Sequence, residues 1–547
     1  TGATTGDILE VVAYTTFDTA NVTGAADFTV TGNLSVDGGT IKLDGNYPVG
    51  TNNVALGDAA LDDGSLSGSY NTALGAASFG NLTSGTANLA VGAYAGQNHT
   101  TGSYNVFVGE EAAVVNTTGS SNTAVGRTAL YSNTTANYNT AVGRQAAYSN
   151  TTGEQNLALG GLAFYTNTTG SYNVALGMES LKANTTSSNN VAVGFRALYS
   201  MSSTGDANKS TAVGYQAGYN STHNVDAFGS QALYSNTTGV LSVAIGREAL
   251  YSNTTASNNT AVGYQAGYST TTGTQNVVMG RGAMHSNSTG SYNVGLGYEA
   301  LVNNTTASNN TAIGYQALYS NTTASGNVAI GTNAGKVSTT AINGVFVGSS
   351  AGTTVTTGND NTCIGYLTGY AGNGANKLTT GYGNILLGSS SNVAATNNYY
   401  SIVIAGNGST GKGSATGFIS PGAGGVYQGN NSSSWSTTSD RRLKKNIVDS
   451  TIGLAEINQL QVRNFEYRTV DEVTELEDHT VIEKSGVQVG VIAQEIQAIL
   501  PNCVKEESTG VLSVDPDNLT WHLIKAVQEL SATNDALTAR ITALEGA

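Results

Sequence analysis

Charged residues are scarce in this chain: Asp, Glu, Lys and Arg make up 10% of its 547 residues, against about a quarter in ordinary globular proteins. The two cysteines, Cys363 and Cys503, are too few for a disulfide scaffold and lack the spacing of a metal site. No run of about 18 apolar residues exists, which excludes a membrane-spanning helix, and no leader resembling a signal peptide opens the chain. The net charge is −15 without a long basic tract, so we expect no nucleic-acid partner.

Glycine is abundant instead, with 70 copies, roughly twice ordinary usage. The charge is unevenly distributed. Residues 439–547 contain 28 charged residues, whereas the four times longer segment 1–438 contains 29. This step in composition indicates that two different kinds of protein are joined near residue 438.

A 17-residue repeat fills most of the longer part. An N-x-A-Φ-G pattern, in which Φ is apolar, recurs in steps of 17 residues from Gly75 to Gly194 and from Gly229 to Gly365. The aligned glycines are Gly57, Gly75, Gly92, Gly109, Gly126, Gly143, Gly160, Gly177, Gly194, Gly214, Gly229, Gly246, Gly263, Gly280, Gly297, Gly314, Gly331, Gly348, Gly365 and Gly388. Such strict periodicity indicates a solenoid of stacked coils.

Individual positions of the repeat have physical interpretations. The glycine permits a positive φ at a corner, and the N-T-T-G and N-T-T-A segments suit a second turn. Asn stands four residues before the glycine in 16 of 20 copies, and stacked Asn side chains hydrogen-bond along a parallel stack. Proline is absent from 49–420, as expected where each coil donates backbone N–H groups to its neighbours.

The inward positions are expected to be mostly Ala and Val, so that each coil buries a thin core and depends on stacking and on partner chains. We therefore expect a mostly β protein: a homotrimeric β-roll or β-solenoid-like shaft of 17-residue repeats, with a small α+β domain at the C-terminus. Its twenty aligned glycines, about 4.8 Å apart, predict a shaft about 90 Å long.

The N-[TV]-A-[VIL]-G motif resembles the head repeats of trimeric autotransporter adhesins. The longer N-T-A-V-G-x-x-A-L-x-x-N-T-T-G pattern resembles the repeats of phage tail fibres. The resemblance covers about 53–390 and implies the architecture rather than the ligand.

Tyrosine stands five residues after the glycine in ten coils. We interpret these rings as packing between coils or chains rather than as a sugar-binding surface. They are Tyr131, Tyr148, Tyr165, Tyr199, Tyr219, Tyr234, Tyr251, Tyr268, Tyr319 and Tyr370. The N-T-T tripeptides match glycosylation sequons but are interpreted as turns, and threonines placed in turns do not favour ice binding.

The flanks of the repeat differ from it. Residues 1–52 alternate polar and apolar residues and are expected to form a β lead-in, while 391–438 are expected to form a degenerate last coil and a neck. The segment from Gly406 to Lys412 lacks the Ser or Thr and the helix of a phosphate-binding loop. A region that attaches the shaft to a baseplate or tail is expected upstream of residue 1.

Residues 439–547 contain S-D-R-R-L-K-K-N-I, then G-V-I-A-Q-E, then I-K-A-V-Q-E-L. This block resembles the C-terminal intramolecular chaperone of the endosialidase type, a self-cleaving serine-peptidase family at the ends of phage tail spikes and fibres. The resemblance implies a domain that trimerises, assists folding of the shaft and is released by cleavage between Thr438 and Ser439. Ser439 would be the nucleophile and Lys444 its general base, in a single turnover without external substrate, cofactor or metal.

A serine–lysine pair is chemically reasonable. Ser is a weak nucleophile until a base takes its proton, and Lys can serve when burial or neighbouring cations lower its pKa. Arg441, Arg442 and Lys445 provide such cations. The alternative is a solvated basic patch next to a structural serine.

One departure from the family pattern concerns the segment before G-V-I-A-Q-E. Many relatives carry a His there, whereas this chain has Gln488 and Val489. This puts the efficiency of cleavage in doubt more than the chaperone role. We interpret Gly490, Gln494 and Glu495 as fold determinants rather than catalysts.

The segment 521–545 carries an a/d heptad seam, which predicts a trimeric coiled coil. Asn534 stands at an a position, where a buried polar residue fixes the register. Trp521 and His522 precede the seam and are expected to pack or cap. The seam consists of Leu523, Val527, Leu530, Asn534, Leu537, Ile541 and Leu544.

Together these patterns predict a trimeric phage tail fibre or spike, located in the virion tail, that attaches to a host-surface glycan or protein. One alternative is a bacterial trimeric surface adhesin with the same C-terminal domain, located on the cell surface. Another is a glycan-degrading tail spike, which needs paired carboxylates in a cleft. The few acids of the repeats stand at different registers: Glu110, Glu111, Glu154, Glu179, Glu248 and Glu299.

Overall fold

A computed structural model describes residues 51–202, 209–370, 377–406, 408–420, 425–428, 435–437, 440–474, 482, 484–507 and 510–546. Nearly all of the expected lead-in at 1–52 lies outside these residues, as do Thr438 and Ser439. The chain divides into two compact units, Thr1–Thr437 and Thr438–Ala547, and each is described by itself.

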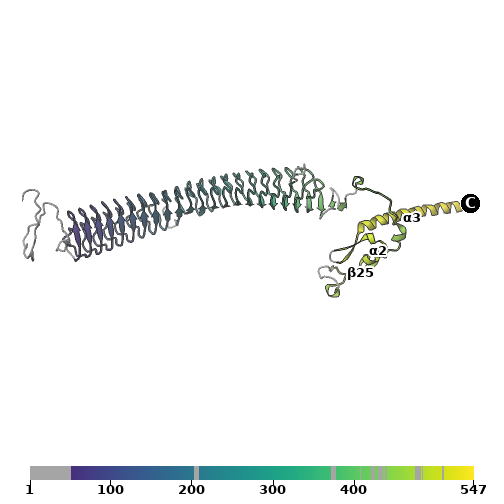
Figure 1. Ribbon diagram of the computed structural model, residues 1–547, viewed down its shortest axis with the longest axis horizontal. Helices are drawn as coiled ribbons and strands as arrows, with labels where there is room; N and C mark the ends of the chain where they lie inside the picture. The colour runs from purple at the N-terminus through teal and green to yellow at the C-terminus, as the bar shows by residue number, and fades with distance from the viewer. Residues whose placement is uncertain are drawn as a thin grey trace, which may run out of the picture. The chain divides into compact units, whose positions relative to one another are not determined.

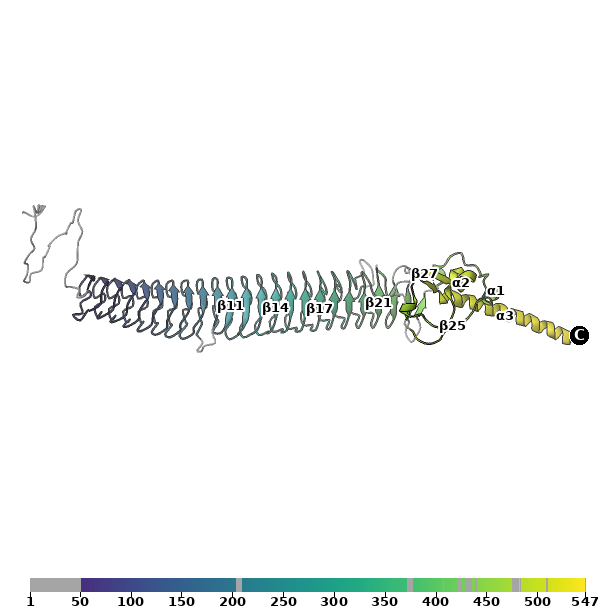
Figure 2. The ribbon, with the colours of Figure 1, turned by 90° about the horizontal axis from the view of Figure 1, so that it is seen from below.

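The first unit is a parallel β-solenoid to which each coil contributes one short strand; Figure 1 and Figure 2 show the coils stacked side by side. Each strand from β1 to β21 pairs in parallel with the next one along the chain. This confirms the expected mostly β solenoid. The strands are β1 (Val54–Leu56), β2 (Thr72–Leu74), β3 (Leu89–Val91), β4 (Val106–Val108), β5 (Thr123–Val125), β6 (Thr140–Val142), β7 (Leu157–Leu159), β8 (Val174–Leu176), β9 (Val191–Val193), β10 (Thr211–Val213), β11 (Val225–Phe228), β12 (Ser242–Ile245), β13 (Thr260–Val262), β14 (Val277–Met279), β15 (Val294–Leu296), β16 (Thr311–Ile313), β17 (Val328–Ile330), β18 (Val345–Val347), β19 (Thr362–Ile364), β20 (Ile385–Leu387), β21 (Ile402–Ala405) and β22 (Gly417–Ser420).

The register of the sheet is kept even where the repeat length changes. Equivalent residues lie opposite each other, as Ala124 and Ala141 do. Thr211 pairs with Val191 across the longer connection from β9 to β10, and with Asp226 across the shorter connection from β10 to β11. Changes in length are therefore absorbed by the loops and leave the sheet intact.

The solenoid extends beyond the expected end of the repeat. Within 391–438, β21 and β22 add two further parallel strands. The direction then reverses, because β23 (Val426–Gln428) pairs antiparallel with β22, and β24 (Trp435–Thr437) pairs antiparallel with β23. This antiparallel end closes the described part of the parallel stack.

The core combines small strand residues with larger residues that follow the corner glycine. The middle residue of each strand is usually Ala and is buried, as at Ala124 and Ala141. Large buried side chains come from four residues after the glycine, as at Leu130 and Leu250. The Val or Ile before the glycine faces outward, as at Val142. The expected interior of Ala and Val is therefore confirmed for Ala. It is wrong for the Val directly before the glycine, which lies on the face of the strand that points away from the core, although single valines such as Val278 are buried.

The corner glycines stack on one another from coil to coil. Gly126 has a φ of 133°, and a Cβ at this position would lie 2.6 Å from the carbonyl oxygen of Gly143. Both the backbone conformation and the lack of space exclude a side chain there. This confirms the predicted role of the glycine.

Buried asparagines form two hydrogen-bonded ladders inside the solenoid. In the first, four residues before the glycine, Asn105 Nδ2 donates to Asn88 Oδ1 and to the carbonyl of Gly119, each over 3.0 Å. In the second, seven residues after the glycine, Asn150 Nδ2 donates to Asn133 Oδ1 over 2.9 Å. The first ladder confirms the predicted Asn stack. The second is formed by the Asn of the N-T-T segments, which the sequence indicated only as turn residues.

The second unit is a small α+β fold. In its described residues, two antiparallel strand pairs, β25–β26 and β27–β28, accompany three α-helices and short 3-10 helices. Its buried centre consists of Ile496, Leu500 and Cys503. Among the described residues, the helices are all too short or too polar to cross a membrane. The elements are η1 (Arg441–Leu443), α1 (Leu454–Ile457), β25 (Arg463–Phe465), η2 (Val470–Glu472), β26 (Gln488–Gly490), α2 (Ala493–Ile499), η4 (Pro501–Cys503), β27 (Val504–Glu506), β28 (Leu512–Val514) and α3 (Pro516–Glu545).

Helix α3 runs without a break through the segment expected to form the coiled coil. The carboxylate of Asp515 caps its first turn by accepting hydrogen bonds from the backbone N–H groups of Asp517 and Asn518. His522 is buried, as expected for a packing residue, whereas Trp521 is exposed.

Breaks in the second Asn ladder generate the first prediction. Thr270 stands between the coils that carry Asn253 and Asn287, and Asn253 Oδ1 is buried without a hydrogen-bond partner. We expect Thr270→Asn to complete the ladder and raise the free energy of unfolding by about 1 kcal/mol, as measured by denaturant titration. Thr272→Asn, on the exposed turn of the same coil, is the matched control. Equal stabilisation by both variants would contradict the ladder explanation.

His99 replaces an asparagine of the second ladder and lies buried against the rings of Phe79 and Phe107. Asn116 Nδ2 donates to its Nδ1 over 2.8 Å, and its Nε2 lies 2.8 Å from the carbonyl oxygen of Gly102. Burial lowers the pKa of the imidazole from 6.5 to about 4. The folded chain therefore holds a neutral imidazole that donates from Nε2 and accepts at Nδ1.

This lowered pKa predicts a specific loss of stability in acid. Between pH 6.5 and about 4 the unfolded chain binds a proton at His99 that the folded chain does not. The free energy of unfolding therefore keeps the full contribution of the neutral imidazole above this window and decreases as the pH falls through it. The loss from this residue should reach about 3 kcal/mol. His99→Asn places the common ladder residue there and should lack this component in denaturation measured between pH 7 and 4. An unchanged pH dependence in that variant would refute the assignment.

Candidate functional site

The segment that follows the expected cleavage site is a short turn stiffened by one ion pair. Asp440 caps η1 by accepting a hydrogen bond from the backbone N–H of Arg442 over 2.8 Å. The Arg442 guanidinium also binds the Asp440 carboxylate, with Nε 3.0 Å from each oxygen, and these bonds lower the pKa of Asp440. Arg442 is thus paired with an acid, which weakens it as a source of positive potential for Lys444.

Lys444 lies one turn beyond Asp440. It is exposed, and its backbone N–H donates to the carbonyl of Arg441 over 3.1 Å. Thr438 and Ser439 lie outside the described residues, so the relation of the Ser439 hydroxyl to the Lys444 ammonium stays a prediction.

Two of the residues interpreted as fold determinants, Glu495 and Gly490, make structural contacts, and so does Gln488 at the position where many relatives carry a His. Glu495 on α2 binds Arg463 on β25 through Nη2 over 2.9 Å and Nε over 3.2 Å. A Cβ on Gly490 would lie 3.1 Å from the Phe465 ring. Gln488 donates to the carbonyl of Gly486 over 2.9 Å. The first of these contacts joins α2 to β25, and the last holds the turn before β26.

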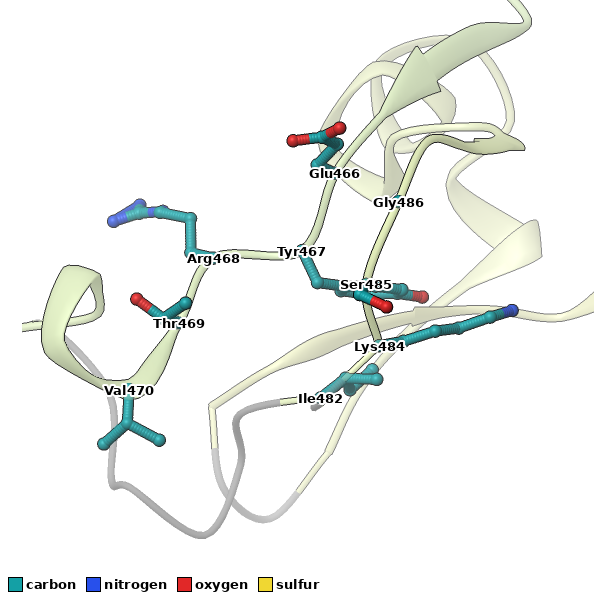
Figure 3. Close-up of a pocket in the computed structure, with 9 residues that line it drawn as sticks. All are labelled: Glu466, Tyr467, Arg468, Thr469, Val470, Ile482, Lys484, Ser485 and Gly486. Carbon is teal, nitrogen blue, oxygen red and sulfur yellow. The ribbon is translucent and has the colours of Figure 1, made fainter.

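A pocket of about 540 Å³ lies between 466–470 on one side and Ile482 with 484–486 on the other (Figure 3). Figure 3 shows that Glu466 and Arg468 point away from Lys484 and Ser485. The Arg468 guanidinium donates instead to the carbonyl of Glu472 over 2.9 Å. The polar groups drawn there therefore do not converge on a common point, as a binding site requires.

The tyrosines five residues after the glycine stack on one another. Tyr131, Tyr148 and Tyr165 follow at centroid distances of 5.1 and 5.2 Å with interplanar angles of 11° and 15°. A longer stack runs from Tyr199 through Tyr219, Tyr234, Tyr251 and Tyr268 to His285. Ring faces that cover each other are closed to a sugar, so the preferred interpretation as packing between coils is confirmed for these two runs.

The acids of the repeats serve as partners for the adjacent coil or turn. Glu179 accepts hydrogen bonds from Lys182 and Arg196, and these lower its pKa, with the Lys182 bond as the largest cause. A hydrogen bond from Gln265 likewise lowers the pKa of Glu248. A glycosidase acid needs the opposite shift, so neither carboxylate suits that role.

The outward row directly before the corner glycine is apolar along its whole length. The other outward position of the strands is mixed, with Thr in seven strands, and the only charged residue in the described strands β1–β22 is Asp226, in β11. Exposed members of the row before the glycine include Leu56, Val142, Leu176, Val213, Phe228, Ile245, Met279, Ile313, Ile330 and Ile364. We call this row before the glycine the strand face.

A second exposed apolar row follows α3. Leu523, Val527, Leu530, Leu537, Ile541 and Leu544 are each more than half exposed. These are the apolar residues of the expected heptad seam. They point away from the small core of the domain.

Comparison with known proteins gives a match in the second unit. No solved structure matches the chain. Residues 439–505, which begin two positions after the end of β24, match the family model described as Chaperone of endosialidase, Peptidase_S74.

Proposed function

We propose that this chain forms the shaft of a trimeric phage tail fibre or spike for attachment to a host surface, folded and trimerised by a C-terminal self-cleaving chaperone. The observation that carries the proposal is the family match at 439–505, immediately after a β-solenoid. A chaperone of this family assists the folding of the β shaft that precedes it in the same chain, and here the solenoid would be that shaft.

The strand face supports assembly with further copies of the same chain. Exposed apolar patches of this length are rare on monomeric soluble proteins. The apolar residue of the strand face recurs once per coil, about every 4.8 Å. A partner that matches this interval along the whole length must have the same coil period. A second and a third copy of this solenoid meet that requirement.

The seam on α3 supports the same assembly at the other end of the chain. Its 4-3 spacing and exposure suit a parallel coiled coil. Asn534 stands within the seam and is exposed in the single chain. In a bundle of identical helices the Asn side chains would meet at one level, which fixes the register of the three chains.

The self-cleavage proposed at Thr438–Ser439 is an acyl shift within the chain. Lys444 takes the proton of the Ser439 hydroxyl, and Oγ attacks the carbonyl carbon of Thr438. The C–N bond breaks as the amine is protonated, which leaves an ester between the two residues. Water then hydrolyses the ester to a Thr438 carboxylate and a free Ser439 hydroxyl. The ion pair of Asp440 with Arg442 would hold the turn that presents the hydroxyl.

Cleavage is tested with Ser439→Ala. The wild-type chain should yield a C-terminal fragment of residues 439–547 on a denaturing gel, and the variant should stay intact because it lacks the nucleophile. Lys444→Gln should slow cleavage by about a hundredfold or more. Ser436→Ala, three residues upstream on β24, is the control and should be cleaved normally. Cleavage of the Ser439 variant at the same bond would contradict the proposal.

Trimerisation is tested on the strand face. Ile313→Asp with Ile330→Asp places two carboxylates on adjacent coils of this face. Burying them at an interface should raise the dissociation constant of the assembly by about two orders of magnitude or more, which sedimentation equilibrium would detect.

The matched control carries Thr306→Asp with Thr323→Asp, two exposed turn residues on adjacent coils. It should remain trimeric, because the turns lie away from the strand face. A wild-type chain that sediments as a monomer, or equal dissociation of both double variants, would contradict the assembly.

A further inference from the structure

A row of exposed tyrosines separate from the stacked ones lies on alternate coils, five residues before the corner glycine. Tyr70, Tyr104, Tyr138 and Tyr172 are 63%, 69%, 64% and 54% exposed. They are two coils apart, about 9.6 Å, which is too far for their rings to stack on one another. We call them the tyrosine row.

The backbone does not explain why tyrosine occupies these positions. The φ angles of the four residues lie between 59° and 63°, a region that favours Gly or Asn. Other coils have Asn at the same position, as at Asn189, Asn258 and Asn309, with φ of 62°, 59° and 61°. Packing does not explain the tyrosines either, because their rings are mostly exposed. Ala87, Gln155 and Leu241 adopt the same conformation at this position, with φ of 58°, 55° and 55°, so neither the backbone nor packing accounts for the choice of tyrosine.

The space between neighbouring members of the row is open and uncharged. Tyr138 and Tyr172 border a trough of about 630 Å³, which is also lined by Gln155 and by the outward first residues of β6, β7 and β8, namely Thr140, Leu157 and Val174. The Gln155 amide donates to the Tyr172 hydroxyl over 3.4 Å. No charged residue is among those that line the trough. In the two preceding gaps of the row the intervening residue is small, Ala87 or Ser121.

We infer that the tyrosine row binds a neutral, extended β-1,4-linked glycan, which deepens the attachment function proposed above and rests on it. In such a glycan each sugar is turned over relative to the last, so the same face recurs at every second sugar, an interval close to two coils of the solenoid. One tyrosine can then stack on each second ring. Gln155 and the tyrosine hydroxyls supply hydrogen bonds to sugar hydroxyls, and the lack of charge suits a neutral polymer.

The test uses cellohexaose, with the α-1,4-linked and curved maltohexaose as the comparison, in calorimetric titrations of the full-length protein. Tyr104→Asn, Tyr138→Asn and Tyr172→Asn are combined in one variant, because Asn already occupies this position in other coils. The variant should bind cellohexaose at least tenfold more weakly than the wild-type chain. Wild-type protein should bind maltohexaose at least tenfold more weakly than cellohexaose.

Tyr292→Asn is the matched control. Tyr292 has a φ of 59° and is 56% exposed, but the coils two steps away carry Asn258 and Gly326, so it belongs to no row. This variant should bind cellohexaose as the wild-type chain does. An equal loss in the control, equal binding of both sugars, or no binding of cellohexaose by the wild-type chain would overturn the inference.

The oligomeric state separates this inference from the proposed function. A change in sedimentation mass of the triple variant would overturn the inference, because the row would then lie between copies of the chain. A wild-type chain that is trimeric and cleaved at Ser439 but does not bind cellohexaose overturns the glycan inference alone. A monomeric chain that binds cellohexaose as expected overturns the trimeric fibre and leaves the tyrosine row as a glycan site.

Discussion

The shaft depends on one constraint: each coil lies on an equivalent coil in register, so each residue type is stacked on its own kind. This places Gly126 against Gly143 where no side chain fits, and it places Asn88 where its Oδ1 accepts from Asn105. A buried amide is costly unless it is hydrogen-bonded, and the ladder supplies a partner in almost every coil. Backbone and side chain thus favour the same alignment.

The same constraint explains the scarcity of charge. Identical charges stacked about 4.8 Å apart would repel along the whole shaft. Where charges do occur, the structure pairs opposite signs one coil apart, as Arg127 with Glu110 and Arg196 with Glu179. Polar amides and hydroxyls stack without this penalty, because each is both donor and acceptor.

Much of the shaft could be predicted from sequence, since in-register stacking requires the same residue types to recur at a nearly constant interval of 17 residues. The corner glycine, the first Asn ladder and the stacking of Tyr131 on Tyr148 follow from period and residue type. The inward direction of the strand did not, because the outward face of β5 combines Thr123 with the apolar Val125, while the inward Ala124 is small, so the alternation gives a weak signal. Leu130 was missed because it is directed inward by a φ of 51°, a backbone state that an apolar pattern does not reveal. At the cleavage site, sequence indicated Ser439 and Lys444, but their relative geometry depends on the fold of the turn and not on spacing alone.

Because the coils are nearly identical, they can also stack out of register by one repeat. A C-terminal folding domain would help to prevent this error. If a coil is displaced by 17 residues, Gly again meets Gly and Asn meets Asn, so the energy gap between correct and shifted stacks is small. Irregular coils widen that gap within one chain: His99 fits between Phe79 and Phe107, and the connection from β10 to β11 is two residues short of a full repeat. Between chains, few local marks, such as Asp226 on β11 beside this row, align one described strand face with another, since an apolar residue recurs on that face in every coil. In the proposed trimer, alignment of three shafts would therefore have to begin at a unique point. The C-terminal domain, with a seam interrupted once by Asn534, would provide that point before the shafts associate along their length.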